Sequence, residues 1–225
     1  MQSIFYHDRV DAGIHLSRIL RPLIKGQKVR VQYDALIVAI PRGGVIIGDT
    51  IASNLGTKLD IVVTRKIPSP ENPELAIGAV MPDGNYFLND VIGPVNVPKY
   101  YVEQQARAQL NEIQRRLLSY RGTTAYDREF DNKIIVLVDD GIATGATLMG
   151  SAHWIKSSFN FRKLIIAVPV APPQILDDLE DFSDEVIVPF TPDPFIAVGR
   201  FYEIFDQVSD DEVKNIMKKY GYNVS

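Results

Sequence analysis

Residues 135–147 read IVLVDDGIATGAT, and this stretch is the most informative part of the chain. An apolar run, 134–138, leads directly into two adjacent carboxylates, Asp139 and Asp140. A loop of small and hydroxyl-bearing residues, 141–147, follows, and a helical pattern comes after it. A short apolar run that is bounded by turn residues is typical of a buried strand. The sequence therefore predicts a strand, a loop and a helix, with two acids where the strand ends.

The loop and the two acids together suggest a pocket for a sugar phosphate. A loop that enters a helix offers unpaired backbone N–H groups and the positive end of the helix dipole, which suit a phosphate. The carboxylates of Asp139 and Asp140 would repel that phosphate but can accept hydrogen bonds from two sugar hydroxyls. The alternative is a buried strand followed by an ordinary helix cap. It explains the apolar run and one acid, but not two acids ahead of so small a loop.

This stretch resembles the signature that binds 5-phosphoribosyl 1-pyrophosphate (PRPP) in type I phosphoribosyltransferases. Four apolar residues, two acids and a short Gly/Thr-rich loop match it, and Gly141 departs from it because the family usually has an aliphatic residue there. The resemblance implies that Asp139 and Asp140 hold the ribose 2′- and 3′-hydroxyls. It also implies that the loop wraps the 5′-phosphate with Ala143, Thr144, Gly145, Ala146 and Thr147. The chain contains no Walker A or Rossmann glycine motif.

Composition bounds the class of protein. A chain of 225 residues with 46% hydrophobic and 23% charged residues predicts one globular domain, 1–225. The net charge of −4 argues against a nucleic-acid partner. Cysteine is absent, the N-terminus does not resemble a signal peptide, and prolines interrupt the longest apolar run. We therefore expect a soluble cytoplasmic protein without a membrane partner.

Strand patterns alternate with helical patterns along the chain. The expected strands are 35–40, 60–64, 134–138, 164–170 and 185–188, and the expected helices are 8–24, 45–55, 98–120, 146–156, 172–179 and 210–220. This alternation predicts an α/β fold with a mainly parallel sheet flanked by helices. Ligands of such sheets bind beyond the carboxyl ends of the strands, which is where the two acids are expected.

Residues 67–125 are expected as an insertion made of a mobile loop, a hairpin and a helix. The segment 67–73 holds three prolines, which predicts neither helix nor strand. Segments 76–81 and 86–88 flank a Pro-Asp-Gly-Asn turn and predict a hairpin. The pattern over 98–120 has a thin apolar stripe, too short for a coiled coil, so we expect a covering or dimer-forming helix and a homodimer.

Pro41-Arg42-Gly43-Gly44 follows the first expected strand. Paired glycines are common in ordinary strand-to-helix turns, but an arginine here places a fixed charge at the ligand-binding edge of the sheet. The segment resembles the pyrophosphate loop of the same family. The resemblance implies that Arg42, Gly43 and Gly44 bind PRPP, and that a cis peptide bond precedes Arg42.

Arg65 and Lys66 end the second expected strand. Two basic residues at such a place are most often only solvated. They resemble the Arg-Lys pair that opens the mobile catalytic loop of adenine and orotate phosphoribosyltransferases, which implies PRPP binding by Arg65 and a catalytic role for Lys66. Segment 67–76 would then close over the reactants and would be the least ordered internal part of the unliganded protein. Glu71 and Glu74 are candidate proton handlers, although surface glutamates are the more common identity.

The segment 185–206 is expected to form a small hood over the site. Its residues 192–199 resemble the hood of hypoxanthine-guanine phosphoribosyltransferases, which implies that Phe195 stacks on the base and that Ile196 lies in the base site. A lone phenylalanine is more often a core residue. Further candidates without separate support are Asp193, Glu203 and Asp206.

Two departures bear on the acceptor. Enzymes for 6-oxopurines usually carry an aspartate where this chain has Ala143, and a lysine on the strand before the hood, whereas 164–170 is apolar throughout. Hypoxanthine, guanine and xanthine are therefore disfavoured. The matching Arg65-Lys66 pair does not by itself indicate adenine, and the pattern looks most like uncharacterised phosphoribosyltransferases of bacteria and archaea.

The resemblance implies transfer of a phosphoribosyl group from PRPP to a nitrogenous base or similar small acceptor, with release of pyrophosphate. The expected catalytic residues are Asp139, Asp140, Arg42 and Lys66. Mg²⁺ is expected to be bound with PRPP, and no metal site made by the protein alone is expected, because the three histidines lack ligand spacing. The alternative is a PRPP or nucleotide sensor without turnover, since the base site departs from the family.

Overall fold

The computed structural model describes the chain except for residues 1–3, 26–29, 73–74, 89–96, 127–129 and 225. Its centre is a five-stranded sheet with the strand order β2-β1-β6-β7-β8, in which all neighbours are parallel. The strands are β1 (Ala35–Ala39), β2 (Lys58–Ile61), β6 (Ile134–Val138), β7 (Lys163–Ala167) and β8 (Glu185–Ile187). The predicted mainly parallel sheet is therefore confirmed.

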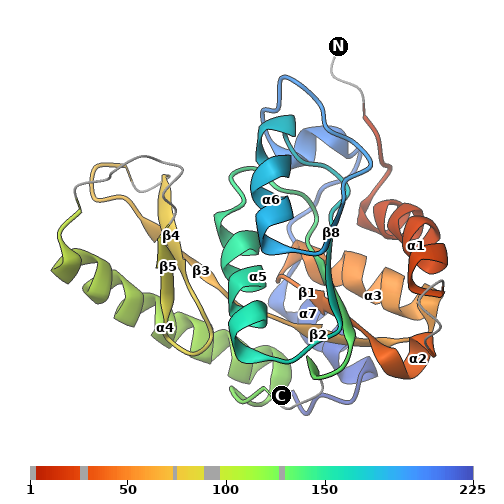
Figure 1. Cartoon of the computed structure of the whole chain (residues 1–225), viewed down its shortest axis with the longest axis horizontal. Helices are drawn as coiled ribbons and strands as arrows, with labels where there is room; N and C mark the ends of the chain where they lie inside the picture. The colour runs from red at the N-terminus through yellow and green to blue at the C-terminus, as the bar shows by residue number, and fades with distance from the viewer. Residues whose placement is uncertain (1–3, 26–29, 73–74, 89–96, 127–129, 225) are drawn as a thin grey trace.

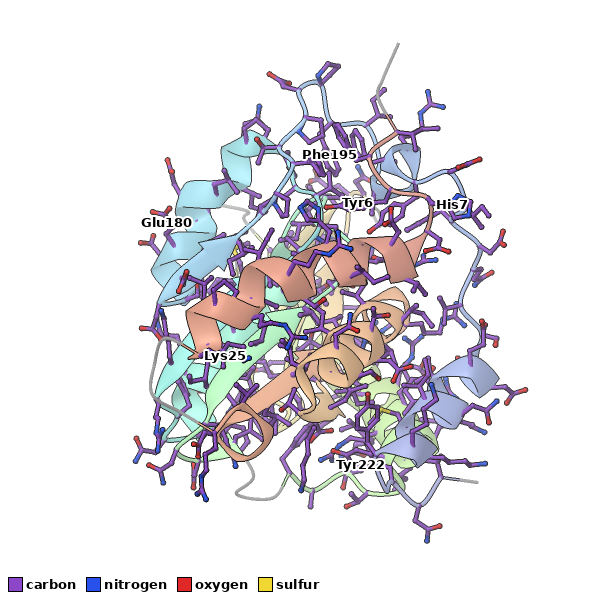
Figure 2. All side chains as sticks on the ribbon, turned by 90° about the vertical axis from the view of Figure 1, so that its right-hand side faces the viewer. Tyr6, His7, Lys25, Glu180, Phe195 and Tyr222 are labelled. Atoms are coloured by element: carbon purple, nitrogen blue, oxygen red, sulfur yellow. The ribbon has the colours of Figure 1, made fainter. Side chains whose placement is uncertain are left out.

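The apolar runs become central strands because both faces of the sheet are covered. All five residues of β1 and of β6 are buried. Ile37 packs into one core cluster and its neighbour Val38 into the other, as the alternation of side chains along a strand requires. Helices α1 (Arg9–Lys25) and α3 (Gly43–Leu55) lie together on one face (Figure 2). Helices α5 (Ala146–Ser158) and α6 (Leu176–Phe182) lie on the other (Figure 1).

A second, antiparallel sheet projects to one side of the first (Figure 1). It contains β3 (Arg65–Pro68), β4 (Ala76–Val80) and β5 (Tyr86–Leu88), and the predicted hairpin corresponds to β4 and β5. The long helix α4 (Lys99–Arg121) covers it, as expected, with an apolar stripe buried at Val102, Ala106, Ile113 and Leu117. The homodimer expected for this helix stays a prediction.

The prediction that 67–73 contains no strand was wrong at its beginning. Ile67 and Pro68 belong to β3 and pair with β4, and the amide of Ser69 donates to the carbonyl oxygen of Leu75 at 2.8 Å. β3 is an edge strand, where the missing N–H of a proline breaks no necessary ladder bond. Ile67 is fully buried, and this burial stabilises the strand.

Several boundaries differ from the expected ones. The second strand begins at Lys58 rather than at residue 60. The strand expected over 164–170 ends at Ala167, and Val170 makes only an isolated bridge to Phe190. The predicted helix over 172–179 starts as a 3₁₀ turn, η3 (Pro173–Ile175), and continues as α6. Neither α2 (Val31–Asp34) nor the 3₁₀ turn η4 (Val198–Phe201) was expected from the sequence pattern.

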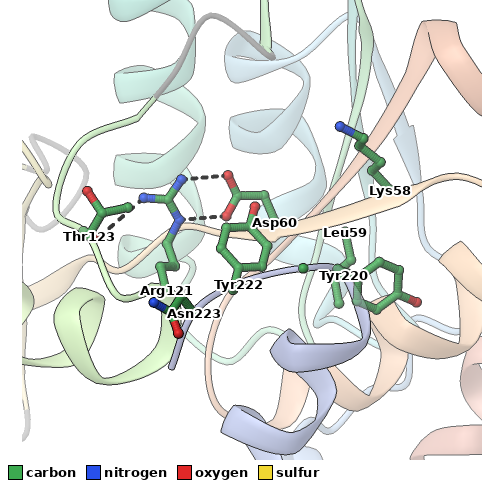
Figure 3. Close-up of a pocket in the computed structure, with 9 residues that line it drawn as sticks. Lys58, Leu59, Asp60, Arg121, Thr123, Tyr220, Tyr222 and Asn223 are labelled. Carbon is green, nitrogen blue, oxygen red and sulfur yellow. Dashed lines mark hydrogen bonds and ion pairs between the residues drawn. The ribbon is translucent and has the colours of Figure 1, made fainter. Parts of the chain in front are cut away.

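The C-terminal end of α4 is attached to the main sheet by a buried ion pair. Arg121 donates two hydrogen bonds to Asp60 of β2, from Nε to Oδ1 at 2.7 Å and from Nη2 to Oδ2 at 2.9 Å. The pair lines a cavity of about 260 Å³ together with Tyr220 and Tyr222, which follow α7 (Asp210–Lys219) (Figure 3). The second sheet is therefore positioned partly by this contact.

No helix among the described residues is both long enough and apolar enough to cross a membrane.

Candidate functional site

Neighbouring strands β1 and β6 bring the two acids and the glycine pair together. The amide of Ile40 donates to the carbonyl oxygen of Val138 at 2.9 Å, so the two chain segments leave the sheet side by side. A Cβ on Gly43 would lie 1.8 Å from Oδ2 of Asp140, and a Cβ on Gly44 would lie 2.9 Å from Cα of Asp139. Only glycines fit this contact. The peptide bond before Arg42 is cis, which confirms that expectation.

Asp140 is held by an arginine from the N-terminal helix. Nε of Arg9 donates to Oδ2 of Asp140 at 2.8 Å, and the side chains are only 10% and 17% exposed. Nη1 of Arg9 donates to the carbonyl oxygen of Asp206 at 2.8 Å, and the guanidinium carbon lies 3.8 Å from the centre of the Phe205 ring. The hydroxyl of Tyr202 donates to the carbonyl oxygen of Asp140 at 2.6 Å. The position of this acid is thus fixed from both its side chain and its backbone.

Arg9 was not among the site residues expected from the sequence. The sequence did contain a sign of its role. Arg9 lies one helical turn before Ala12 and two turns before Leu16, and therefore on the face of α1 that becomes buried. A buried arginine needs a partner with opposite charge, so this position predicts a buried carboxylate nearby. Which carboxylate it meets depends on how α1 packs against the end of β6.

Burial of the acids changes their protonation. Burial raises the pKa of Asp139 well above its usual range, and the charge of Asp140 raises it further. Burial also raises the pKa of Asp140, which the charge of Arg9 and its hydrogen bond oppose. The amide of Asp140 donates to Oδ1 of Asp139 at 2.8 Å. In the unliganded protein, Asp139 is therefore the acid that ionises at greater cost.

We expect Asp139→Asn to stabilise the unliganded protein at neutral pH. An acid whose pKa is raised in the folded state costs stability once the pH exceeds its ordinary pKa, and this cost is complete above the raised pKa. Asparagine removes the cost while it keeps the acceptor oxygen. The expected gain is about 1 kcal/mol, or roughly 2–4 °C in Tm for a chain of this length. Thermal unfolding at several pH values measures it. The gain should shrink as pH falls below the raised Asp139 pKa and should vanish below the ordinary pKa of an aspartate, and a gain that persists at such acidic pH would contradict the explanation.

The loop after the acids enters α5 with backbone amides that have no protein acceptor in the described part of the chain. These amides are the N–H groups of 143–147. Gly145 precedes α5 with a φ of 74°, and a Cβ there would lie 2.2 Å from Ile175. Gly141 has a φ of 153°, and a Cβ there would lie 2.5 Å from Val198. These close contacts require glycine at both positions. Gly141, where the chain departs from the family pattern, is one of them.

Arg65 and Lys66 lie at the start of β3, close to the loop that enters α5. The hydroxyl of Thr64 donates to the carbonyl oxygen of Thr147 at 3.1 Å, which joins this corner to the first turn of α5. Nε of Arg65 donates to Oε1 of Gln109 at 3.0 Å, and Lys66 is exposed. Arg65 is therefore brought to the edge that carries the acids, although in the described part of the chain no recorded contact joins it to them.

The expected hood lies above the same edge of the sheet. The Phe195 ring is partly buried, with its centre 5.1 Å from that of Phe201, whereas Ile196 is 65% exposed. The contact of Val198 with Gly141 joins the hood to the acid loop, but within the described residues no recorded contact joins Phe195 or Ile196 to the acids. Figure 2 shows Phe195 above Tyr6, which precedes α1. Stacking of a base on Phe195 stays a prediction.

The remaining candidates are acidic residues that had little separate support from the sequence, and those that the structure describes differ in their surroundings. Glu71 and Asp193 are exposed, and Glu74 lies outside the described residues. Glu203 accepts from Nδ1 of His7 at 2.8 Å, and this bond raises the His7 pKa. Asp206 accepts from Nη1 of Arg9 through its backbone carbonyl oxygen. The structure therefore gives none of the described candidates a contact with the two acids.

A sequence model described as the phosphoribosyl transferase domain matches residues 8–190. The chain belongs to this family. A Mycobacterium tuberculosis H37Rv protein named provisionally as a phosphoribosyl transferase is 38% identical over 210 residues, which are 92% of this chain and 45% of that protein. The chain thus spans about half the length of the curated relatives it matches.

Solved structures agree with this fold. The structure of TT1426 from Thermus thermophilus is 33% identical, with a TM-score of 0.79 over 96% of this chain and 99% of that one. The L. donovani hypoxanthine-guanine phosphoribosyl transferase is 10% identical, with a TM-score of 0.50 over 85% of this chain and 83% of its own. The second likeness shows the fold alone. The resemblance on which the sequence analysis depended is confirmed.

Proposed function

We propose that this phosphoribosyltransferase-family protein transfers a phosphoribosyl group from PRPP to a nitrogenous base or similar acceptor and releases pyrophosphate. The observation that carries the proposal is the packing of Gly43 and Gly44 against Asp140 and Asp139, beside the loop amides that lead into α5 and have no acceptor among the described residues. This arrangement offers acceptors for ribose hydroxyls and donors for phosphates within one edge of the sheet.

Each group has a proposed role. Asp139 and Asp140 accept hydrogen bonds from the two ribose hydroxyls, and the amides of 143–147 donate to the 5′-phosphate. Arg42 and Arg65 hold the pyrophosphate, together with Lys66. The bond between C1 of the ribose and the pyrophosphate oxygen breaks, the oxygen keeps the electron pair, and the acceptor nitrogen bonds to C1. Where that nitrogen carries a hydrogen, its proton passes to water or to the released pyrophosphate. The arginines stabilise the charge that develops on the leaving group.

The residues present fit Mg²⁺ that is bound with PRPP. Among the described residues, no group of three or more histidine, cysteine, aspartate or glutamate side chains could hold a metal by itself. Mg²⁺ usually keeps several waters and is held by one or two carboxylates plus substrate phosphates. Asp139 and Asp140 would supply such carboxylates, and the metal would neutralise charge on the pyrophosphate.

The surroundings of the base site support an acceptor other than a 6-oxopurine. Lys163 is the only lysine of β7, and it lies at the amino end of that strand, where Nζ contacts Oε2 of Glu185 at 2.5 Å. Lys163 therefore lies at the amino ends of the parallel strands, whereas the two acids lie at their carboxyl ends. Ala143, at the position of the usual aspartate, offers no proton-handling group. Because the base site lacks these residues, a non-catalytic PRPP sensor is the second candidate function.

A pyrophosphate-release assay tests the proposal. It combines the protein with Mg²⁺, PRPP and a panel of purine, pyrimidine and nicotinate-like acceptors, alongside calorimetric titration with PRPP. Turnover with any acceptor supports the transferase. PRPP binding with no turnover across the panel would favour the sensor, and a protein that does not bind PRPP would contradict both functions.

We expect segment 67–76 to become more protected from hydrogen exchange when PRPP and an acceptor bind together. Its base is already tied by β3 and by the bond between Ser69 and Leu75, so the change should be greatest around 70–72. Hydrogen exchange with and without both ligands measures it. Equal, strong protection in both states would leave the segment as a fixed wall of the site.

A further inference from the structure

Helix α4 carries a polar stripe along the side that faces β3 and the start of α7. The stripe consists of Gln109, Glu112, Arg116 and Tyr120. Spacings of three, four and four residues place these side chains on one face of a helix. The stripe runs beside the edge where the proposed function places the pyrophosphate.

Each end of the stripe holds an arginine that the proposed function assigns to PRPP. At one end, Oε1 of Gln109 accepts from Nε of Arg65 at 3.0 Å. At the other end, the hydroxyl of Tyr120 donates to Oδ1 of Asp210 at 2.6 Å, and Arg42 donates to the same oxygen from Nη1 at 3.2 Å. Two arginines, one from the turn after β1 and one from β3, are therefore connected to one helix face.

The buried Tyr120 is suited to this connection. Burial, followed by its hydrogen bond to Asp210, raises the pKa of Tyr120 to about 12. Its phenol therefore stays protonated and donates at neutral pH. The bonds from Tyr120 and Arg42 lower the pKa of Asp210, which keeps this carboxylate ionised beside the guanidinium.

Arg116 lies in the stripe between Gln109, which contacts Arg65, and Tyr120, which is connected to Arg42 through Asp210. Its Nε donates to Oε1 of Glu112 at 2.7 Å. Arg115 donates to both oxygens of the same carboxylate, at 2.7 and 2.9 Å, and already neutralises it. Among the described residues, no partner is recorded for the terminal nitrogens of Arg116, whose side chain is 24% exposed. They can take a further anion.

The cluster carries an excess of positive charge. Four arginines (Arg42, Arg65, Arg115 and Arg116) surround two carboxylates (Glu112 and Asp210). Burial lowers the pKa of Arg65, and repulsion from Arg116 lowers it further, so these guanidinium groups are close enough to repel. A polyanion placed between them would relieve this repulsion.

We propose that Arg116 is a further PRPP-binding residue that contacts the pyrophosphate group together with Arg42 and Arg65. In this arrangement Gln109, Tyr120 and Asp210 are positioning residues that act through those arginines. A guanidinium with two unused terminal nitrogens can bind phosphate oxygens through paired hydrogen bonds. This inference rests on the proposed function, and it extends the PRPP site to a helix outside the loops that the family resemblance names.

The test compares Arg116→Gln with Arg107→Gln, an exposed arginine of the same helix for which the described part of the chain records no ion pair. Calorimetry measures the Kd of each variant for PRPP, for pyrophosphate with Mg²⁺ and for ribose 5-phosphate. Arg116→Gln should weaken PRPP and pyrophosphate binding about tenfold, since a hydrogen bond to a charged group is lost. Ribose 5-phosphate binding should not change, and Arg107→Gln should match the wild type with all three.

The possible outcomes separate this inference from the proposed function. Equal PRPP binding by Arg116→Gln and Arg107→Gln would overturn the role of Arg116. Equal weakening of PRPP and ribose 5-phosphate by Arg116→Gln would also overturn it, because the effect would not be confined to the pyrophosphate. A wild-type protein that does not bind PRPP would overturn the proposed function instead. Partial recovery of pyrophosphate binding in Arg116→Lys, at an unchanged Tm, would support the charge contact.

Discussion

Replacing both Asp139 and Asp140 with asparagine is expected to weaken PRPP binding by at least about a hundredfold, because two hydrogen bonds from hydroxyls lose their charged acceptors. The fold should remain intact, because asparagine has nearly the same shape. It can also still accept from Arg9, which now donates to Oδ2 of Asp140 at 2.8 Å. Calorimetric titration with PRPP and Mg²⁺ measures the loss, and thermal unfolding checks the fold.

A second pair of adjacent aspartates provides the matched control. Asp177 and Asp178 lie in the first turn of α6, outside the candidate site, with the same local sequence of two acids. Asp177→Asn with Asp178→Asn removes the same net charge and should leave PRPP binding unchanged. If the variant at 139 and 140 bound PRPP as well as this control, the assignment of the acids to the ribose would be wrong.

Arg121→Met is expected to lower the free energy of unfolding by about 3–5 kcal/mol, because it leaves a buried carboxylate without its partner. Arg121 and Asp60 are each only 4% exposed. Burial raises the pKa of Asp60, and the hydrogen bonds from Arg121 oppose this rise. The guanidinium also lies 4.1 Å from the centre of the Tyr126 ring and donates to the carbonyl oxygen of Ala125 at 2.7 Å. Denaturant unfolding measures the loss.

An exposed ion pair of the same helix serves as the control. Nζ of Lys99 lies 3.7 Å from Oε1 of Glu103, and their side chains are well exposed. Lys99→Met should change stability by no more than about 0.5 kcal/mol, as is usual for exposed pairs one helical turn apart. An effect of Arg121→Met as small as this would show that the buried pair does not fix α4 against β2. The contact that holds α4, and with it Arg116, against the main sheet would then be weaker than the structure indicates.

The sequence could predict the elements that depend on local pattern. The apolar runs of β1 and β6 predicted central strands, because a strand covered on both faces must be apolar at every position. The acids after β6 and the glycines after β1 were then expected at one edge, because parallel strands end there together. Their packing against each other, with space only for glycine, follows that expectation closely.

Prolines misled the prediction for the loop after Arg65. Their spacing indicated an irregular segment, yet Ile67 and Pro68 form an edge strand. The prolines correctly indicated that N–H donors are missing from this segment. They contained no information on which side of the strand would be paired with a neighbour. Burial of Ile67 beneath α4 and the pairing with β4 decided the outcome, and both partners are distant in sequence.

By itself the sequence determined the fold class, the family and the two loops that carry the acids and glycines, because each is encoded by residues adjacent in the chain. The side chains that complete the site could be identified only once the helices had been placed on the sheet. Arg9 meets Asp140, and Arg42 meets Asp210, across more than half the chain. Hydrogen bonds act over about 3 Å, so such partners are set by how helices pack on the sheet, and no local pattern specifies that packing.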